Sequence, residues 1–559
     1  MPGRRRWSRN YDTLSFEGSW RNWLFVHEHL SGYVWTKAAL AALERARGEV
    51  FRAEEALARK KVDPDKLPPE ALNFPFRTTP YLHQKRGLFI SREMEAFAYF
   101  MEMGTGKTKV TCDKAAYGWS IGAIDTLLVA SRNGVHEQWV NEEVPKHMPD
   151  WCRWKAAPPL YTSMYAKDEK KFEEVLAYKD GLRVFAINIE ALSHQSGYDR
   201  VQKVLNRSRA LFTIDESTKI KNHTSTRGKN AIILGKEAVW RLILSGAPIT
   251  QGIEDLYAQF MFLNPGILPV GSYTDFEHRY CKMGGYEGKE IVGYKNVEEL
   301  QRYIDPYVFR VLKKDCLDLP EKVYMERHVL MTDDQRKKYR AMKNELLLQL
   351  ENGQLVTAQN AAVAVSKLQQ ITSGFLLDEN GEVAWFANPN PRVQELLNVL
   401  EEASDEQAII WCRFRYDVRV VTDALKEASI SFGEFHGGTS AEDRQKARED
   451  LRSGKVRCLV CTQAADAGNN FQTASLAVYY SNSFDADFRW QSEDRIHRIG
   501  QTKICTYVDL VAPRTVDGHI VKALADKKDV ATGMLDRPAG HNKDESVVAL
   551  ARSVLQEDT

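Results

Sequence analysis

Two series of short apolar runs constrain the fold of this 559-residue chain more than any other feature. The first series is "AFAYFMEM", "AIDTLLVAS", "LRVFAINI", "ALFTIDE" and "WRLILSG", and the second is "QAIIWCRF", "SFGEFHG", "VRCLVCT", "LAVYYSN" and "ICTYVDLV". Stretches with the periodicity of helices separate the runs. This alternation predicts parallel strands that are covered by helices on both faces. We therefore expect an α/β fold with two lobes, each built on a parallel sheet.

The segments outside the two series predict the domain boundaries. "TKAALAALERARGEVFRAEEALARKK" favours one long helix, and "VDPDKLPPEALNFPF" interrupts it with four prolines. We expect a mainly helical N-terminal region and linker at 1–74, a first lobe at 75–265, an inter-lobe segment at 266–320, a second lobe at 321–527 with a helical insertion near 333–375, and a C-terminal tail at 528–559. The tail is expected to be partly disordered, with a short terminal helix.

Charge and cysteine content exclude few functions. A formal charge of +1 is compatible with a local basic stripe for nucleic acid. The eight cysteines lack the dense spacing of a secreted disulfide framework, and Cys458 and Cys461 in "VRCLVCT" are interpreted as core residues rather than zinc ligands. No apolar stretch approaches the roughly 20 residues of a membrane span. We expect a cytoplasmic protein that does not bind a membrane.

"MEMGTGKT", residues 101–108, ends as a phosphate-binding loop does, although Met101 occupies the position of the first glycine in the pattern G-x-x-x-x-G-K-[ST]. An apolar run precedes the loop and a helical stretch follows it. In that setting the loop amides and the helix N-terminus bind phosphate oxygens, Lys107 adds a cation, and the Thr108 hydroxyl can hold Mg²⁺. The loop predicts a nucleotide site.

Two further segments supply groups that ATP hydrolysis needs. "ALFTIDES" ends a strand with Asp215, which can hold Mg²⁺, and Glu216, which can orient or deprotonate the attacking water. "RWQSEDRIHRIGQ" places Arg495 and Arg498 three residues apart, so that both can project from one face of a helical turn as arginine fingers. Taken singly, an exposed acidic pair and a solvated basic helix face remain the alternatives.

The order of these motifs resembles the Snf2-like group of superfamily 2 helicase-related ATPases over about residues 76–505. "TTPYLHQKRG" resembles the segment whose glutamine reads adenine, and "MEMGTGKT" is similar to the family loop D-E-M-G-x-G-K-T, which also lacks the first glycine. "LSGAPITQGIEDLYAQFMFLNPGIL", "PYVFRVLKKDCLDLPEK" and "FHGGTSAEDRQKA" resemble further motifs in the family's order. "QSEDRIHRIGQ" is similar to Q-A-x-x-R-x-x-R-I-G-Q and is the most specific string.

The resemblance implies two RecA-like lobes with ATP and Mg²⁺ bound between them. It implies catalytic roles for Lys107, Glu216, Arg495 and Arg498; nucleotide contacts by Gln84, Gly104, Thr105, Gly106, Lys107, Thr108 and Gly468; metal contacts by Thr108 and Asp215; and nucleic-acid contacts by Ser131, Arg132, Asn188, Arg413, Gly438, Thr439 and Thr462.

The function that this resemblance implies is a DNA-stimulated ATP hydrolase that moves along double-stranded DNA and remodels protein–DNA or branched DNA complexes, usually without separating strands. We expect a compact bacterial or phage-type member, acting as a monomer in the bacterial cytoplasm or an infected host cell, with a possible protein partner at the N-terminal region. A strand-separating DNA or RNA helicase and a nucleotide-gated DNA-binding subunit are the alternatives.

Several positions depart from the family pattern. They are Thr218 in place of a histidine, Ser245 and Ala247 in place of threonines, and Gln463, Ala465 and Asp466 in place of an arginine and paired glycines. Because an aspartate near a phosphate backbone would repel it, Asp466 argues against a nucleic-acid contact by this loop, whereas Gly468 and Asn470 keep the family pattern.

Overall fold

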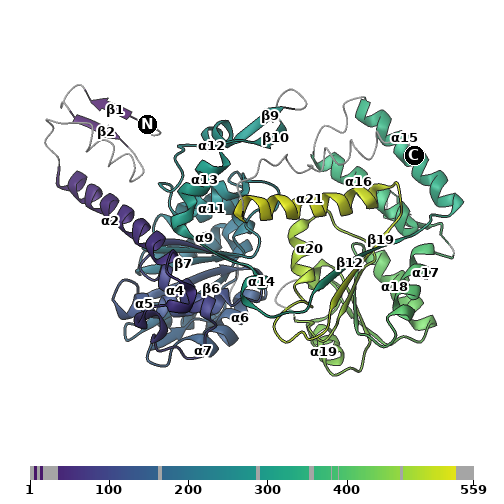
Figure 1. Ribbon diagram of the computed structural model, residues 1–559, viewed down its shortest axis with the longest axis horizontal. Helices are drawn as coiled ribbons and strands as arrows, with labels where there is room; N and C mark the ends of the chain where they lie inside the picture. The colour runs from purple at the N-terminus through teal and green to yellow at the C-terminus, as the bar shows by residue number, and fades with distance from the viewer. Residues whose placement is uncertain are drawn as a thin grey trace. The chain divides into compact units, whose positions relative to one another are not determined.

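The computed structural model describes residues 5–8, 13–16, 36–161, 166–284, 290–351, 358–378, 381–387, 389–465 and 470–536. Within these residues the chain divides into two compact units: the first comprises the residues up to Cys316 together with 531–536, and the second comprises Leu317–Val530. In each unit, helices pack against a central parallel sheet (Figure 1). The expected α/β fold with two sheets is confirmed.

A seven-stranded parallel sheet forms the centre of the first unit, in the order β11-β3-β8-β7-β4-β6-β5. The strands are β3 Ala96–Met101, β4 Thr126–Ser131, β5 Trp154–Ala156, β6 Leu182–Asn188, β7 Ala210–Asp215, β8 Trp240–Ser245 and β11 Val308–Val311. Five of them coincide with the first series of apolar runs, because the central strands are buried on both faces and need apolar side chains throughout.

The two edge strands were not expected from the sequence. Strand β5 is short and only partly buried. Strand β11 lies within the interval expected to be an inter-lobe segment, and it pairs in parallel with β3, so that Val311 lies opposite Met101. The chain therefore returns to the strand that carries the phosphate-loop motif before it enters the second unit.

Helices and two short strands complete the first unit. They are α3 Pro69–Leu72, α4 Leu82–Ser91, α5 Lys107–Ser120, α6 Val135–Gln138, α7 Val144–His147, α8 Ala166–Leu176, α9 Gln195–Leu205, α10 Thr226–Gly235, α11 Asp255–Leu263, α12 Tyr273–Tyr280, β9 Cys281–Gly284, β10 Glu290–Tyr294, α13 Val297–Ile304 and α14 Lys313–Cys316. Strands β9 and β10 pair in antiparallel orientation.

The long N-terminal helix is confirmed as α2, Lys37–Lys60. Its N-cap is Thr36, whose hydroxyl oxygen accepts a hydrogen bond of 3.2 Å from the amide of Ala39. Arg59 forms an ion pair of 2.8 Å with Glu93, which fastens the end of α2 to the rest of the first unit. An antiparallel strand pair, β1 Arg5–Ser8 and β2 Thr13–Phe16, precedes it in the chain.

A six-stranded parallel sheet forms the centre of the second unit, in the order β12-β19-β18-β15-β17-β16. The strands are β12 Lys322–His328, β15 Ala408–Trp411, β16 Phe432–Phe435, β17 Cys458–Cys461, β18 Leu476–Tyr479 and β19 Cys505–Val511. All five runs of the second series are strands. Cys458 and Cys461 are buried in clusters on opposite faces of the sheet, so the two thiols cannot hold one metal ion together.

The interval expected as a helical insertion contains α15 Asp333–Glu351 and α16 Ala358–Ser373. The other elements of the second unit are β13 Phe375–Leu377, β14 Val383–Trp385, α17 Pro391–Glu402, α18 Arg415–Glu427, α19 Ala441–Arg452, α20 Ala486–Glu493 and α21 Val516–Asp536. Helix α21 enters the expected tail, and the rest of the tail lies outside the described residues. No helix within the described ranges is long and apolar enough to cross a membrane.

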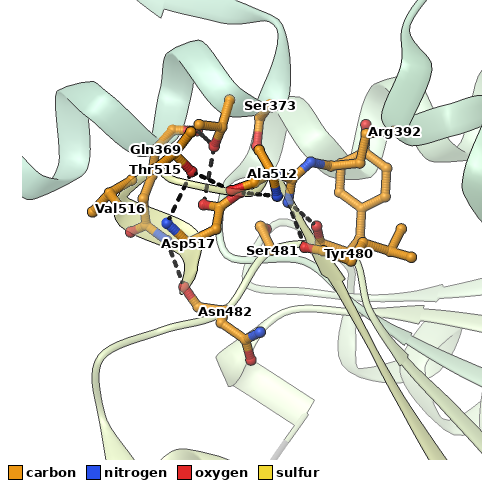
Figure 2. Close-up of polar contacts among 12 residues, drawn as sticks. Gln369, Ser373, Arg392, Tyr480, Ser481, Asn482, Ala512, Thr515, Val516 and Asp517 are labelled. Carbon is orange, nitrogen blue, oxygen red and sulfur yellow. Dashed lines mark hydrogen bonds and ion pairs between the residues drawn. The ribbon is translucent and has the colours of Figure 1, made fainter. Parts of the chain in front are cut away.

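A buried polar network joins the helices of the second unit to its sheet (Figure 2). The Arg392 guanidinium on α17 donates to the carbonyls of Tyr480 at 2.6 Å and Leu510 at 3.2 Å, and it forms an ion pair with Asp517 on α21. The Thr372 hydroxyl on α16 donates to the other Asp517 oxygen at 3.0 Å. Because Arg392 is 1% exposed, these partners compensate for the loss of water around its charge.

Candidate functional site

The phosphate-loop motif forms a tight turn between strand β3 and helix α5. Gly104 and Gly106 have φ angles of 80° and 91°, which favour glycine. A Cβ atom on Gly106 would lie 2.1 Å from the Nε2 atom of Gln84. Met101 is fully buried at the end of β3. The residue in place of the first glycine is therefore a strand residue, and the turn needs glycine only at the two later positions.

Side chains around the turn bind the loop itself. The Lys107 ammonium donates to the carbonyl oxygen of Met101 at 2.8 Å. Gln84 Nε2 donates to the carbonyl oxygen of Thr105 at 3.0 Å, and the ring nitrogen Nε2 of His83 lies 2.8 Å from the same oxygen. These contacts bring Gln84, Thr105 and Lys107 together around the turn. A bound nucleotide would compete for the polar groups of Lys107 and Gln84.

The acidic pair stands at the same edge of the sheet. Strand β7 ends at Asp215, and strand β8 alone separates it from β3. The indole N–H of Trp139 donates to Asp215 Oδ2 at 2.9 Å. Burial raises the pKa of the Asp215 carboxyl, while the hydrogen bond from Trp139 and the charge of Lys107 act to lower it. Lys107 and Asp215 are thus electrostatic neighbours.

Glu216 occupies a strained backbone conformation. Its φ angle is 56°, in the left-handed region that residues other than glycine seldom adopt. Such strain costs about 1–3 kcal/mol and is typical of active-site residues that the surrounding structure holds in place. The conformation turns the chain sharply at the end of β7, directly after the carboxylate of Asp215.

The site's donor set fits a magnesium ion bound together with phosphates. Mg²⁺ in nucleotide sites is usually held by one or two carboxylates and by phosphate oxygens and water. The Asp215 carboxylate at the end of β7 and the hydroxyl of Thr108, the second residue of α5, are oxygen groups of this kind. The described residues contain no group of three or more His, Cys, Asp or Glu that could hold a metal by itself. A phosphate-assisted site does not need one.

The turn after β8 is joined to the acidic motif through a residue that the sequence did not point to. The Ser217 hydroxyl donates to Gln259 Oε1 at 2.6 Å, and Gln259 Nε2 donates to the carbonyl oxygen of Pro248 at 2.8 Å. By contrast, Thr218, which stands in place of the family histidine, has a buried hydroxyl with no hydrogen-bond partner in the part of the chain that the structure describes. The neighbouring serine makes the link.

Asp255 organises the same turn. Its Oδ2 atom accepts hydrogen bonds from the amide of Thr250 at 2.8 Å, the hydroxyl of Thr250 at 2.9 Å and the amide of Gln251 at 2.9 Å. The Lys221 ammonium, just after the acidic motif, reaches the Thr250 hydroxyl at 2.5 Å and Asp255 at 3.3 Å. These bonds therefore hold the segment after β7 to the segment after β8. A lone glutamine and an aspartate in the otherwise apolar helix α11 were the only sequence signals.

The two candidate arginine fingers lie in the second unit. Arg495 is 4% exposed and Arg498 is partly buried. Helix α20 ends at Glu493; Arg495 follows it in a hydrogen-bonded turn and Arg498 at a bend. Both arginines lie beyond the end of helix α20, and their projection from one face stays a prediction. The turns form because the amide of Arg495 bonds to the carbonyl of Ser492 at 3.3 Å and Gly500 takes a φ angle of 96°.

The nucleic-acid candidates of the first unit end two neighbouring strands. Ser131 and Asn188 face each other in register at the ends of β4 and β6, and Arg132 follows Ser131. Ser131 is 1% exposed, and the side-chain oxygen of Asn188 already accepts a hydrogen bond of 2.9 Å from the amide of Glu190. The structure brings these residues to one edge of the sheet. The Ser131 side chain is buried there, and the Asn188 side chain is engaged in a hydrogen bond.

In the second unit, two neighbouring arginines differ in exposure. Arg413 is partly buried, burial lowers its pKa, and its Nη1 atom has no hydrogen-bond partner among the residues described. Arg415, at the start of α18, is exposed, and its Nη2 atom lies 3.2 Å from the point that a Cβ atom on Gly438 would occupy. The Thr439 hydroxyl oxygen accepts from the amide of His436 at 3.2 Å. Arg415, Gly438 and Thr439 thus lie together.

The remaining two candidates are Thr462 and Gly468. Thr462 directly follows strand β17 and is partly buried. Gly468 lies outside the described residues, as does Asp466.

Comparison with known proteins gives two matching family models. The SNF2-related domain matches residues 55–374, and the helicase conserved C-terminal domain matches residues 391–500. These ranges contain the phosphate loop, the acidic motif and both arginines.

Curated relatives are longer proteins. An uncharacterized ATP-dependent helicase of Mycoplasma genitalium is 25% identical over 322 residues, which are 57% of this chain and 30% of the relative. The chromatin structure-remodeling complex subunit snf21 of Schizosaccharomyces pombe is 24% identical over 382 residues, 64% of this chain and 32% of the relative. The chain spans about a third of the length of these two relatives. The Sulfolobus solfataricus SWI2/SNF2 ATPase core in complex with dsDNA is 22% identical, with a TM-score of 0.37 over 84% of this chain and 96% of that chain.

Proposed function

The chain belongs to the SNF2-related family, and from that premise we propose that it is a DNA-stimulated ATPase. We further propose that it moves along double-stranded DNA and remodels protein–DNA or branched DNA complexes without separating the strands. The observation that carries the proposal is the placement of a glycine turn with Lys107 and an acidic pair at one edge of a single sheet, one strand apart.

Nucleotide binding would use the loop amides and two side chains that are now bonded to the loop. Lys107 exchanges the carbonyl of Met101 for phosphate oxygens, and Gln84 exchanges the carbonyl of Thr105 for the adenine edge. Thr108 and Asp215 would hold Mg²⁺, which neutralises charge on the phosphates. Since Asp215 can bind a cation only when ionised, the nearby ammonium of Lys107 helps to keep it in that form.

Hydrolysis would then depend on a positioned water and on added positive charge. Glu216 orients or deprotonates the water, and its strained backbone fixes the direction of its side chain. Arg495 and Arg498 stabilise the negative charge that spreads over the transferred phosphoryl group. The network from Ser217 through Gln259 to Pro248 would connect the acidic motif to the turn after β8 during turnover.

Nucleic acid would be held by its phosphate backbone. In the first unit the contacts are Ser131, Arg132 and Asn188, and in the second unit they are Gly438, Thr439 and Thr462, with Arg415 in the role first given to Arg413. A duplex bound through backbone phosphates can be followed along its length irrespective of sequence. The relatives' names describe ATP-dependent helicases and chromatin remodelling, which supports an action on DNA complexes. We propose that a monomer suffices and that residues 1–74 hold any protein partner.

The test compares ATP hydrolysis without nucleic acid and with duplex DNA, single-stranded DNA and RNA. We expect the largest stimulation with duplex DNA and none in the Lys107→Ala protein. Stimulation by RNA alone would refute the DNA assignment and favour an RNA helicase. Hydrolysis by Lys107→Ala at the unmodified rate would show that the loop is not the ATP site.

A further inference from the structure

Glu102 joins the phosphate loop to the segment that leads out of the first unit. It lies between the end of β3 and the glycine turn. Its amide donates to the carbonyl of Val311 at 3.0 Å, and its Oε2 atom accepts from the amide of Lys313 at 2.5 Å. Its own carbonyl oxygen accepts from the hydroxyl of Thr105 at 2.6 Å and from the Thr105 amide at 3.3 Å. All three polar groups of one residue are thus engaged.

The partners of Glu102 lie where the chain leaves the first unit. Strand β11 ends at Val311, helix α14 begins at Lys313, and the second unit begins at Leu317, directly after α14. The amide bound by the Glu102 carboxylate is at the N-terminus of α14, where amides have no partner within the helix. A carboxylate is a strong acceptor for such a group. Glu102 therefore fixes the start of the connection to the second unit.

The other end of the same residue touches the loop that phosphates would bind. Phosphate oxygens would restrain the loop amides, and with them Thr105, whose amide and hydroxyl hold the Glu102 carbonyl. Phosphates would also draw Lys107 away from the Met101 carbonyl, which belongs to the peptide unit that carries the Glu102 amide. Nucleotide binding would therefore alter the restraints on Glu102 from two sides.

We propose that Glu102 is a positioning residue that transmits nucleotide occupancy from the phosphate loop to the start of the connection between the two units. The inference rests on the proposed ATP binding, and it requires no contact between Glu102 and the nucleotide. Its role is mechanical: the side chain couples the loop to Lys313 through a single hydrogen bond. Removal of the carboxylate should leave ATP binding intact. ATP binding should then no longer change the restraints at the start of the connection.

The test is hydrogen exchange at the Lys313 amide in the full chain, with and without Mg-ATP, in a Glu216→Gln background that is expected to bind ATP without hydrolysing it. In the parent, ATP should slow exchange at this amide at least about threefold, because the restrained loop holds Glu102 more firmly. In Glu102→Ala the slowing should vanish while the ATP affinity stays within about threefold of the parent. Glu102→Gln keeps an acceptor oxygen without the charge and should give an intermediate value.

The matched control is Glu237→Ala, an exposed glutamate of the same unit far along the chain from the loop, which should behave as the parent. The proposal is overturned if Glu102→Ala retains the ATP-dependent slowing, or if ATP binds the parent without any change at Lys313. DNA-stimulated hydrolysis is measured separately in the unmodified protein. Its absence would refute the proposed DNA function, whereas the exchange result depends on ATP binding alone.

Discussion

Substitution of Gly106 by alanine tests the geometry of the phosphate loop. Gly106 has a φ angle of 91°, and an added Cβ would lie 2.1 Å from Gln84 Nε2. Gly122 provides a matched control in the same unit, because its φ angle is 68° and a Cβ there meets nothing within 4 Å. Both variants place alanine in the left-handed region, but only one displaces a neighbour.

The two variants should therefore differ in their free energy of unfolding by the contribution of the Gln84 hydrogen bond. The left-handed conformation costs an alanine about 1–2 kcal/mol, partly offset by the lower entropy of the unfolded chain, so Gly122→Ala should lose about 1 kcal/mol of stability. Gly106→Ala should lose a further 1–3 kcal/mol, roughly, because the buried Gln84 amide loses its hydrogen bond to the Thr105 carbonyl, 3.0 Å long. It should also lose ATP affinity.

Urea unfolding of the full chain, followed by circular dichroism, measures these differences in the transition of the first unit. Because the chain has two units, the two transitions are fitted separately. In a Gln84→Ala background the clash is gone, and Gly106→Ala should then cost only as much as Gly122→Ala. Equal destabilisation by the two glycine substitutions in the unmodified chain would refute the reasoning about Gln84.

Further variants address chemistry, DNA binding and pH. Lys107→Ala should abolish ATP binding, whereas Glu216→Gln should bind ATP and hydrolyse it roughly 10²–10⁴-fold more slowly, as phosphate release will show. Arg415→Ala should weaken duplex binding and lower the salt slope by about 1, and Arg413→Ala should leave that slope unchanged. Burial raises the pKa of Asp417 from 3.8 to about 6. Since the folded form holds this proton more tightly, the contribution of Asp417 to stability is fully present below about pH 4 and is lost as pH rises through 6, by up to roughly 3 kcal/mol, and Asp417→Asn should remove this loss.

The following results would contradict these predictions. Native hydrolysis by Glu216→Gln would remove its assignment as the base. A reduced slope in Arg413→Ala with none in Arg415→Ala would mean that the partly buried Arg413, and not Arg415, contacts the DNA. A pH dependence of unfolding that is the same with aspartate and asparagine at position 417 would show that this carboxyl is not the group that titrates.

The sequence predicted the interior of both sheets because a strand buried on both faces must be apolar along its whole length. It did not predict β11 or β12, since edge strands carry mixed residues, and the pairing of Val311 with Met101 joins parts of the chain that no local pattern connects. The expected inter-lobe segment therefore contains a strand of the first sheet.

The candidate site divides in a similar way. The loop and the acidic pair could be found from sequence because their chemistry requires adjacent residues with fixed spacing. Gln259 could not be found so readily, because its partners Ser217 and Pro248 come close only when β7 and β8 are neighbours. The choice between Arg413 and Arg415 depends on which side chain is buried, and spacing does not determine that.

The most direct test of the proposed function is displacement of a third strand from a DNA triplex, measured beside strand separation of the same duplex. With ATP, we expect the unmodified protein to release the third strand while the duplex strands remain annealed. The Lys107→Ala protein should release nothing. Separation of the duplex strands at a rate equal to or above that of third-strand release would contradict translocation on intact duplex DNA and would identify a strand-separating helicase instead.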